Sequence, residues 1–191
     1  SNVEVPVPYC KQGLVYTVDR NTLFEAEICD GAHSSLCQTL DEALQTASSA
    51  SGSVVRVLHD VDGEGHRLPG GVRTVLDLNG KVLRGNGTAP VLVVEGDLTL
   101  RDSSATGSGR VTMKSDFEGL VEYGGGVCNY GVFTLESGVI EGCTAGDFGG
   151  GIMGVEGSVT SIRGGEVRGC KAEAGSAICS RSRFEMTGGA V

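Results

Sequence analysis

Short segments of alternating apolar and polar residues recur along the C-terminal half of the chain. The block Gly124–Cys128 reads Gly-Gly-Gly-Val-Cys; it returns as Gly-Gly-Gly-Ile-Met at Gly149–Met153 and as Gly-Ser-Ala-Ile-Cys at Gly175–Cys179. Its apolar fourth residue recurs after 25 and then 26 positions, from 127 to 152 and from 152 to 178. Two more blocks follow in order, one at Phe133–Leu135, Thr160–Ile162 and Phe184–Met186, and one at Val139–Cys143 and Glu166–Cys170.

Fainter copies of these blocks extend towards the N-terminus. They are Leu92–Val94, Gly96–Leu100 and Arg110–Thr112, preceded by Leu76–Leu78 and Val82–Asn86. Val54–Leu58 has the pattern of the first strand in the series. Strict alternation is typical of a strand with one buried and one exposed face. Each repeat is therefore predicted to hold three short strands separated by glycine-containing turns.

Such short strands cannot bury an apolar face alone, so successive repeats must stack. Stacking places equivalent strands side by side and parallel, about 4.8 Å apart. Three strands in about 25 residues describe a parallel β-helix, because a propeller blade needs four strands in about 40–45 residues. An antiparallel sandwich does not explain the strict repeat. We therefore predict an all-β fold, a parallel β-helix of about five to six turns over residues 53–191.

The segment before the repeats has the pattern of an amphipathic helix that covers the first turn. Its apolar stripe at helical spacing consists of Leu40, Ala43, Leu44 and Ala47. Ser35 with Gln38, or Thr39 with Glu42, has the spacing of a capping box. Gly52 is well placed to end the helix. Residues 1–52 are therefore expected to form an N-terminal cap region, with a strand at residues 13–18.

The C-terminal end of the repeat array lacks a polar cap. Val191 aligns with Ile140 and Val167, so the sequence stops within a strand of the repeat. An unprotected strand edge invites pairing with another strand. We expect either that the β-helix continues beyond residue 191 or that the chain self-associates through this open C-terminal end.

Composition supports this fold and narrows the range of partners. Glycine contributes 32 of 191 residues, aromatic residues only 5%, and tryptophan is absent, so the core must consist of aliphatic side chains. The net charge of −9 argues against nucleic acid, because phosphate binding requires clustered Lys and Arg. The longest apolar stretches, such as residues 90–94, are too short to span a bilayer. We expect no nucleic-acid partner and no membrane insertion in this segment.

The repeats resemble those of large bacterial surface proteins with a pectin-lyase-like, right-handed parallel β-helix. The resemblance rests on Gly124–Val127, Phe133–Leu135 and Ser137–Ala145, and on Val75–Gly80 in an early turn. Gly188–Val191 is also similar to the Gly-Gly-Ala-hydrophobic half of the repeat in polymorphic membrane proteins, although their Phe-x-x-Asn half is missing.

This resemblance implies a secreted or cell-surface module that acts without catalysis, as an adhesin-like recognition surface or stalk. Its partner would be a glycan or a host or cell-surface protein. The same fold also hosts polysaccharide lyases and glycoside hydrolases, because fold alone does not determine function. A carbohydrate-active enzyme therefore remains the alternative, and a purely structural spacer is a third interpretation.

Seven cysteines require an explanation: Cys10, Cys29, Cys37, Cys128, Cys143, Cys170 and Cys179. No Cys-x-x-Cys motif occurs, so no zinc site is expected. Cys143 and Cys170 occupy the same position in consecutive turns, within the Cα separation of about 4.4–6.8 Å that a disulfide tolerates. They are either a disulfide or two stacked buried thiols. Cys29 and Cys37 are candidates for a second bond, with Cys10 as a competing partner.

Charged residues near the strand ends are the candidates for chemistry. They are Asp97, Asp102, Glu136, Glu141, Glu156 and Glu166, with Arg110, Lys114, Arg163 and Arg168 nearby. They do not recur as a compact motif, and Glu141 aligns with Arg168, which predicts a cross-turn ion pair on a solvated face. We therefore expect no catalytic residues. An enzyme would require at least three carboxylates, or carboxylates with Arg or Lys, within about 10 Å on the outer surface.

Two further motifs have a structural and a functional interpretation. Residues 60–65 (Asp-Val-Asp-Gly-Glu-Gly) resemble the beginning of a calcium loop, but Gly71 replaces the bidentate Glu, so an acidic turn is favoured. We expect no cofactor, with Ca²⁺ kept as the alternative. Asn86 begins an Asn-Gly-Thr sequon and aligns with Cys143 and Cys170, at a turn position where this fold often stacks buried asparagines. A buried ladder role is favoured for Asn86.

Overall fold

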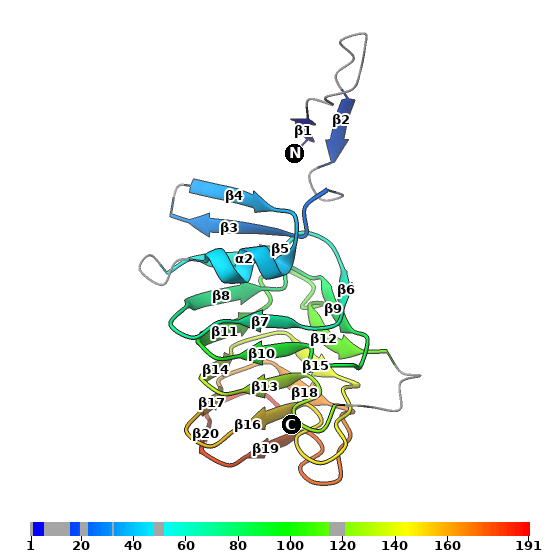
Figure 1. The fold of residues 1–191 in the computed structure, drawn as a ribbon, viewed down its shortest axis with the longest axis vertical. Coiled ribbons are helices and arrows are strands. Elements are labelled where there is room, and N and C mark those ends of the chain that lie inside the picture. Colours follow the sequence, from blue (N-terminus) through cyan, green and yellow to red (C-terminus); the bar gives the residue numbers. More distant parts are fainter. Residues whose placement is uncertain (1, 6–15, 20–22, 32, 48–51, 115–120) are drawn as a thin grey trace.

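The computed structural model describes residues 2–5, 16–19, 23–31, 33–47, 52–114 and 121–191. Within them the chain winds into a β-helix in which three parallel sheets run along the coil (Figure 1). The architecture predicted from the repeat is confirmed. Each turn contributes one strand to each sheet, and equivalent strands of successive turns are neighbours.

The first sheet consists of β7 (His66–Leu68), β10 (Leu92–Val94), β13 (Val127–Asn129), β16 (Ile152–Gly154) and β19 (Ile178–Ser180). The second consists of β5 (Val54–Val57), β8 (Arg73–Asp77), β11 (Asp97–Arg101), β14 (Val132–Leu135), β17 (Val159–Ile162) and β20 (Arg183–Met186). The third consists of β6 (Val61–Gly63), β9 (Val82–Gly85), β12 (Arg110–Met113), β15 (Val139–Glu141) and β18 (Glu166–Arg168).

The core consists of stacked aliphatic side chains, as the alternation predicts. In the third sheet the strand register aligns five inward residues, each at most 3% exposed: Val61, Leu83, Val111, Ile140 and Val167. Their sequence neighbours point outwards. Because each side chain packs on its equivalents above and below, burial is continuous along the coil.

Helix α2 (Leu40–Thr46) covers one end of this core. Its Leu40, Ala43 and Leu44 are fully buried. Of the two predicted capping boxes, half of the one at Thr39 is confirmed, since Thr39 Oγ1 accepts a hydrogen bond from the Glu42 amide at 3.1 Å. The Glu42 carboxylate accepts from the amide of Gln38 at 3.0 Å instead of that of Thr39. The prediction that Gly52 ends the helix is wrong, because α2 ends at Thr46 and the backbone leaves the helical conformation at Ala47, where ψ is 128°.

A β-hairpin completes the capped end. Strand β3 (Ala26–Asp30) pairs antiparallel with β4 (His33–Cys37) and also antiparallel with β5, the first strand of the coil. These two strands extend the second sheet beyond the coil (Figure 1). The edge that β5 would expose is therefore occupied by a strand of opposite direction, which prevents pairing with another coil.

Strands β1 (Asn2–Val5) and β2 (Tyr16–Asp19) pair antiparallel with each other. The strand expected at residues 13–18 is thus confirmed for residues 16–18, with β1 as its partner. Residues 13–15 lie outside the described residues.

The glycine-rich blocks permit close approach of successive turns. A Cβ atom at Gly126 would lie 2.6 Å from the Gly151 carbonyl oxygen, and a Cβ at Gly151 would lie 2.4 Å from the Ala177 carbonyl oxygen. Neither contact is tolerable for a side chain. The second and third glycines of the run therefore do more than form a turn: they let the backbone of one repeat rest on that of the next.

The opposite end of the coil exposes apolar side chains. Phe184 is 42% exposed, Met186 44% and Val191 60%. The bridge between Glu166 and Ala190 places Val191 level with Val167, as the repeat alignment predicts. Strands β18, β19 and β20 each stand at the end of their sheet.

Candidate functional site

The outer side of the third sheet carries four of the ten charged residues that the sequence singles out, namely Arg110, Glu141, Glu166 and Arg168. Its register aligns two outward columns, namely Asp62, Arg84, Thr112, Glu141 and Arg168, and beside it Val82, Arg110, Val139 and Glu166. We call this surface the ion-paired face. Strand alternation places these residues outwards because their neighbours fill the core.

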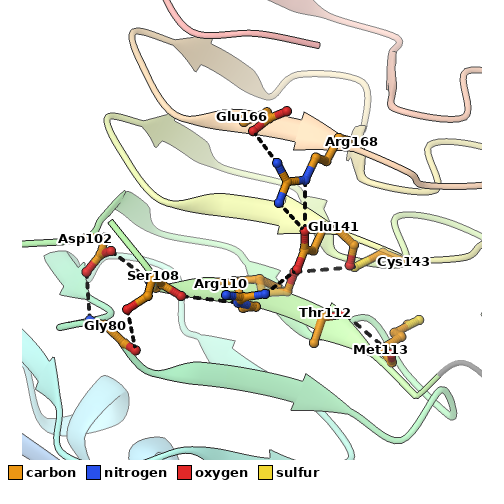
Figure 2. A network of polar contacts seen from close by, with 12 residues as sticks. Gly80, Asp102, Ser108, Arg110, Thr112, Met113, Glu141, Cys143, Glu166 and Arg168 are labelled. Atoms are coloured by element: carbon orange, nitrogen blue, oxygen red, sulfur yellow. Dashed lines mark hydrogen bonds and ion pairs between the residues drawn. The ribbon is translucent and has the colours of Figure 1, made fainter. Parts of the chain in front are cut away.

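Glu141 is the centre of the ion-paired face (Figure 2). Its carboxylate accepts hydrogen bonds from Arg110 at 2.8 Å, and from Nε and Nη2 of Arg168 at 2.9 and 2.7 Å. Arg168 also donates to Glu166 at 2.9 Å. The Arg168 hydrogen bond and the bond from Arg110 outweigh burial and lower the pKa of Glu141. The cross-turn ion pair predicted between Glu141 and Arg168 is confirmed.

A shallow hollow of about 420 Å³ lies on this face. Its lining consists of Val82, Arg84, Arg110, Thr112, Met113, Lys114 and Glu141. Arg84 is paired with Asp62 of the preceding turn at 2.8 Å. Carboxylates and arginines are thus brought together within the separation that an enzyme would need. The pKa of Glu141, however, is lowered by its two arginine partners, whereas a general acid requires a raised pKa.

Asp102 holds the turn beside this face together. Its carboxylate accepts hydrogen bonds from the amides of Gly80 and Gly109, both at 2.7 Å, and from that of Ser104 at 3.1 Å. Burial acts to raise its pKa, but these hydrogen bonds prevail and leave the pKa below the ordinary value. The turn also positions Arg110, whose Nε donates to the Ser108 carbonyl at 3.2 Å (Figure 2). Asp102 is therefore a structural carboxylate.

The remaining charged candidates are not part of this cluster. Asp97 lies on β11 of the second sheet, where it pairs with Arg73 at 2.7 Å. Glu136 and Arg163 directly follow strands of that sheet, and Glu156 lies in the turn between β16 and β17. The structure thus brings together Arg110, Lys114, Glu141, Glu166 and Arg168, and places the other five elsewhere, Asp102 in the turn beside them.

Cys143 and Cys170 are stacked as predicted, but they are free thiols. The Lys171 amide bonds the Cys143 carbonyl at 2.9 Å, which fixes the stacking of the two turns. Each thiol lies near a carbonyl two residues earlier: Cys143 Sγ is 3.5 Å from that of Glu141, and Cys170 Sγ is 3.3 Å from that of Arg168. A hydrogen bond with Cys143 lowers the pKa of Cys170 to about 7. The stacked-thiol alternative is the one observed, and the disulfide is not formed.

Cys29 and Cys37, the second predicted disulfide pair, lie on the hairpin strands β3 and β4. Cys37 is a free thiol that lies opposite Ala26, while Cys29 lies opposite Ser34, so the suggested Cys29–Cys37 bond is wrong. The competing partner Cys10 lies outside the described residues.

The prediction that Asn86 is a rung of a buried ladder is also wrong. Asn86 is half-buried, and its Oδ1 accepts hydrogen bonds from the amide and hydroxyl of Thr88 at 3.0 and 2.7 Å. Its side chain therefore stabilises its own turn, as asparagines commonly do. The buried asparagine is Asn129, which is 0% exposed and donates to the carbonyl of Val159 at 2.9 Å in the next turn.

The acidic segment 60–65 forms hydrogen bonds and an ion pair with the next turn of the coil. Asp60 accepts a hydrogen bond from the Val82 amide at 2.9 Å, and Asp62 pairs with Arg84. Within the described residues, no three His, Cys, Asp or Glu side chains are placed to hold a metal ion.

Comparison with known proteins adds no relative. No family model, no curated protein and no solved structure matches this chain. In the part of the chain that the structure describes, no helix has the length and apolarity needed to cross a membrane. The structure shows the parallel β-helix. The resemblance to pectin-lyase-like adhesins comes from the sequence repeats alone.

Proposed function

We propose that this chain is a non-catalytic β-helix module of a secreted or cell-surface protein of the pectin-lyase-like adhesin type, and that it recognises a glycan. The observation that carries the proposal is the pairing of Glu141. A general acid or base must exchange a proton near the working pH. A carboxylate held between two arginines stays ionised and is poorly suited to that task.

The ordered pattern of the ion-paired face supports the same interpretation. Asp62 with Arg84, and Glu141 with Arg110 and Arg168, join residues of different turns. Asp97 with Arg73 does the same on the second sheet. Such pairs join neighbouring turns and leave an ordered surface with one shallow hollow, which suits a stalk or a recognition platform.

The test is a combined binding and degradation assay. The chain is incubated with immobilised neutral and acidic polysaccharides, with and without Ca²⁺, and both retained protein and released reducing or unsaturated ends are measured. We expect retention on at least one polysaccharide without product above the buffer rate. Product release that Glu141→Gln abolishes would overturn the proposal in favour of a polysaccharide lyase or glycoside hydrolase.

We also propose that two copies associate through the exposed last turn. The favouring observation is a hollow of about 480 Å³ that Phe184, Met186 and Val191 help to line, next to the unpaired edge of β20. Sedimentation velocity should show concentration-dependent dimers that Phe184→Lys removes. The matched control Val132→Lys, at a 36% exposed position in the middle of the coil, should leave the dimers intact. A monomer at high concentration would contradict this second proposal.

A further inference from the structure

An aromatic column runs along the coil on the corner that precedes the first sheet. Tyr123 and Phe148 stand before β13 and β16 in equivalent positions of consecutive turns, joined by a parallel bridge. Their ring centroids are 6.0 Å apart and their planes differ by 7°. The guanidinium of Arg181 lies over the Phe148 ring, 4.6 Å from its centroid. We call Tyr123, Phe148 and Arg181 the aromatic column.

The column ends at a hollow where the preceding turn supplies no ring. The register of β10 with β13, which pairs Leu92 with Val127, places Thr88 level with Tyr123 one turn earlier. Ala89 and Tyr123 both line a hollow of about 270 Å³, together with Thr88, Pro90, Glu122 and Tyr130. Phe148 does not line it. Tyr123 is therefore the last ring of the column and the one that meets this space.

Two exposed tyrosines line this hollow, although aromatic residues are rare in the chain. Aromatic residues make up 5% of the sequence, and tryptophan is absent. Tyr123 is 38% exposed and Tyr130 52%, and both line the same hollow. Tyrosine offers a flat apolar face with a polar tip, the combination that binds a ligand with one apolar and one hydroxylated side.

The polar groups at the hollow indicate which ligand fits. Thr88, Glu122 and the Tyr130 hydroxyl supply hydrogen-bonding groups beside the aromatic face. Glu122 is the one charged residue in the lining, which disfavours phosphate and acidic sugars. The volume lies just below the usual range for small-molecule sites, about 300–1,000 Å³, so it suits one ring of a longer chain.

We propose that this hollow binds one pyranose ring of a neutral glycan, with the apolar face of the sugar stacked on Tyr123. The sugar ring lies on the side of Tyr123 that faces the preceding turn, where Thr88 supplies no ring. Its hydroxyl groups bond Glu122, Thr88 and Tyr130. This inference rests on the proposed glycan-recognition function and assigns it a site, away from the ion-paired face.

The test uses neutral hexasaccharides of glucose, galactose, mannose and xylose as probes, with hexagalacturonate as the acidic comparison, titrated calorimetrically into the whole chain. We expect at least one neutral hexasaccharide to bind and hexagalacturonate to bind more weakly. Tyr123→Ala should weaken binding about tenfold or more, while Tyr123→Phe, which keeps the ring, should stay within about twofold. Circular dichroism confirms that each variant is folded.

A second variant tests the same site without removing anything from the column. Ala89→Tyr adds a ring to the hollow and should block binding. If no neutral hexasaccharide binds, or if binding survives both Tyr123→Ala and Ala89→Tyr, the assignment is wrong. Retention that survives these changes would leave the recognition function in place with a different site. If product were released and Tyr123→Ala weakened binding as expected, the non-catalytic function would be overturned and the site at Tyr123 would be retained.

Discussion

The ion-paired face and the two rings of the aromatic column are both built from residues that occupy equivalent positions in successive turns, yet they end differently. On the ion-paired face, Glu141 meets Arg110 on one side and Arg168 on the other, so its charge is satisfied within the coil. The aromatic column runs from Arg181 to Tyr123 and then stops, because the next position is Thr88, which has no ring. The ion pairs join successive turns, whereas the hollow beside Tyr123 is the place where we propose that a ligand binds.

The largest expected effect is on the structural side of this comparison. Asp102→Asn should lower the free energy of unfolding by about 1–3 kcal/mol, because the ionised carboxylate accepts three backbone hydrogen bonds. Glycan retention should not change. Urea denaturation of the variant measures the loss, and Glu136→Gln, at an exposed carboxylate, is the matched control with little effect.

The lowered pKa of Asp102 determines how the stability difference between wild type and Asp102→Asn depends on pH. The folded pKa of Asp102 is lowered, so the stabilisation is fully present above the ordinary pKa of 3.8 and is lost as pH falls through the folded value. The gap between wild type and Asp102→Asn should therefore be constant at neutral pH and shrink in acid. A gap that widens as pH falls would contradict the structural role.

An intermediate effect is expected within the aromatic column. A double-mutant cycle with Tyr123→Ala and Phe148→Ala should give a coupling of about 0.5–1.5 kcal/mol, the range for parallel aromatic pairs. Thermal unfolding of the four proteins measures it. Zero coupling would show that the rings are neighbours without interaction, and would weaken the argument that Tyr123 is preorganised to receive a sugar ring.

The smallest effect is expected for a single ion pair. Glu141→Gln should cost no more than about 1 kcal/mol, because its arginine partners are substantially solvent-exposed and such pairs contribute little. The cost should decrease with added salt, since mobile ions screen exposed charges. Denaturation at low and high ionic strength checks this. A large, salt-independent loss would mean that Glu141 has a role other than pairing.

The sequence was informative wherever one turn could be aligned with the next. The period of 25–26 residues predicts the strands, the inward aliphatic columns and the Glu141–Arg168 pair, because a column in a β-helix is an alignment position. The stacking of Cys143 on Cys170 follows for the same reason. The alignment does not show whether the two sulfurs form a disulfide, because it gives the level of a residue in the coil and not the direction of its side chain.

The failures have equally particular causes. Asn86 was aligned with Cys143 and Cys170, but Lys114 stands between Asn86 and Cys143 in the register, so no continuous ladder exists there. The aligned repeat blocks begin after the aromatic column and therefore do not include it. The sequence nevertheless contains its pattern, because Tyr123 and Phe148 each stand directly before a triple glycine. The short α2 and its cap at Thr39 followed from local pattern, whereas its early end at Thr46 did not.

The claim that the carboxylates of the ion-paired face stabilise the coil and do not transfer protons is tested most directly by NMR titration of Glu141. Its side-chain carboxyl resonance, assigned by comparison with Glu141→Gln, is followed from neutral pH into acid. The account predicts a midpoint below the ordinary value of 4.5, because Arg168 and Arg110 favour the ionised form. A midpoint raised towards neutrality, as a general acid requires, would contradict it.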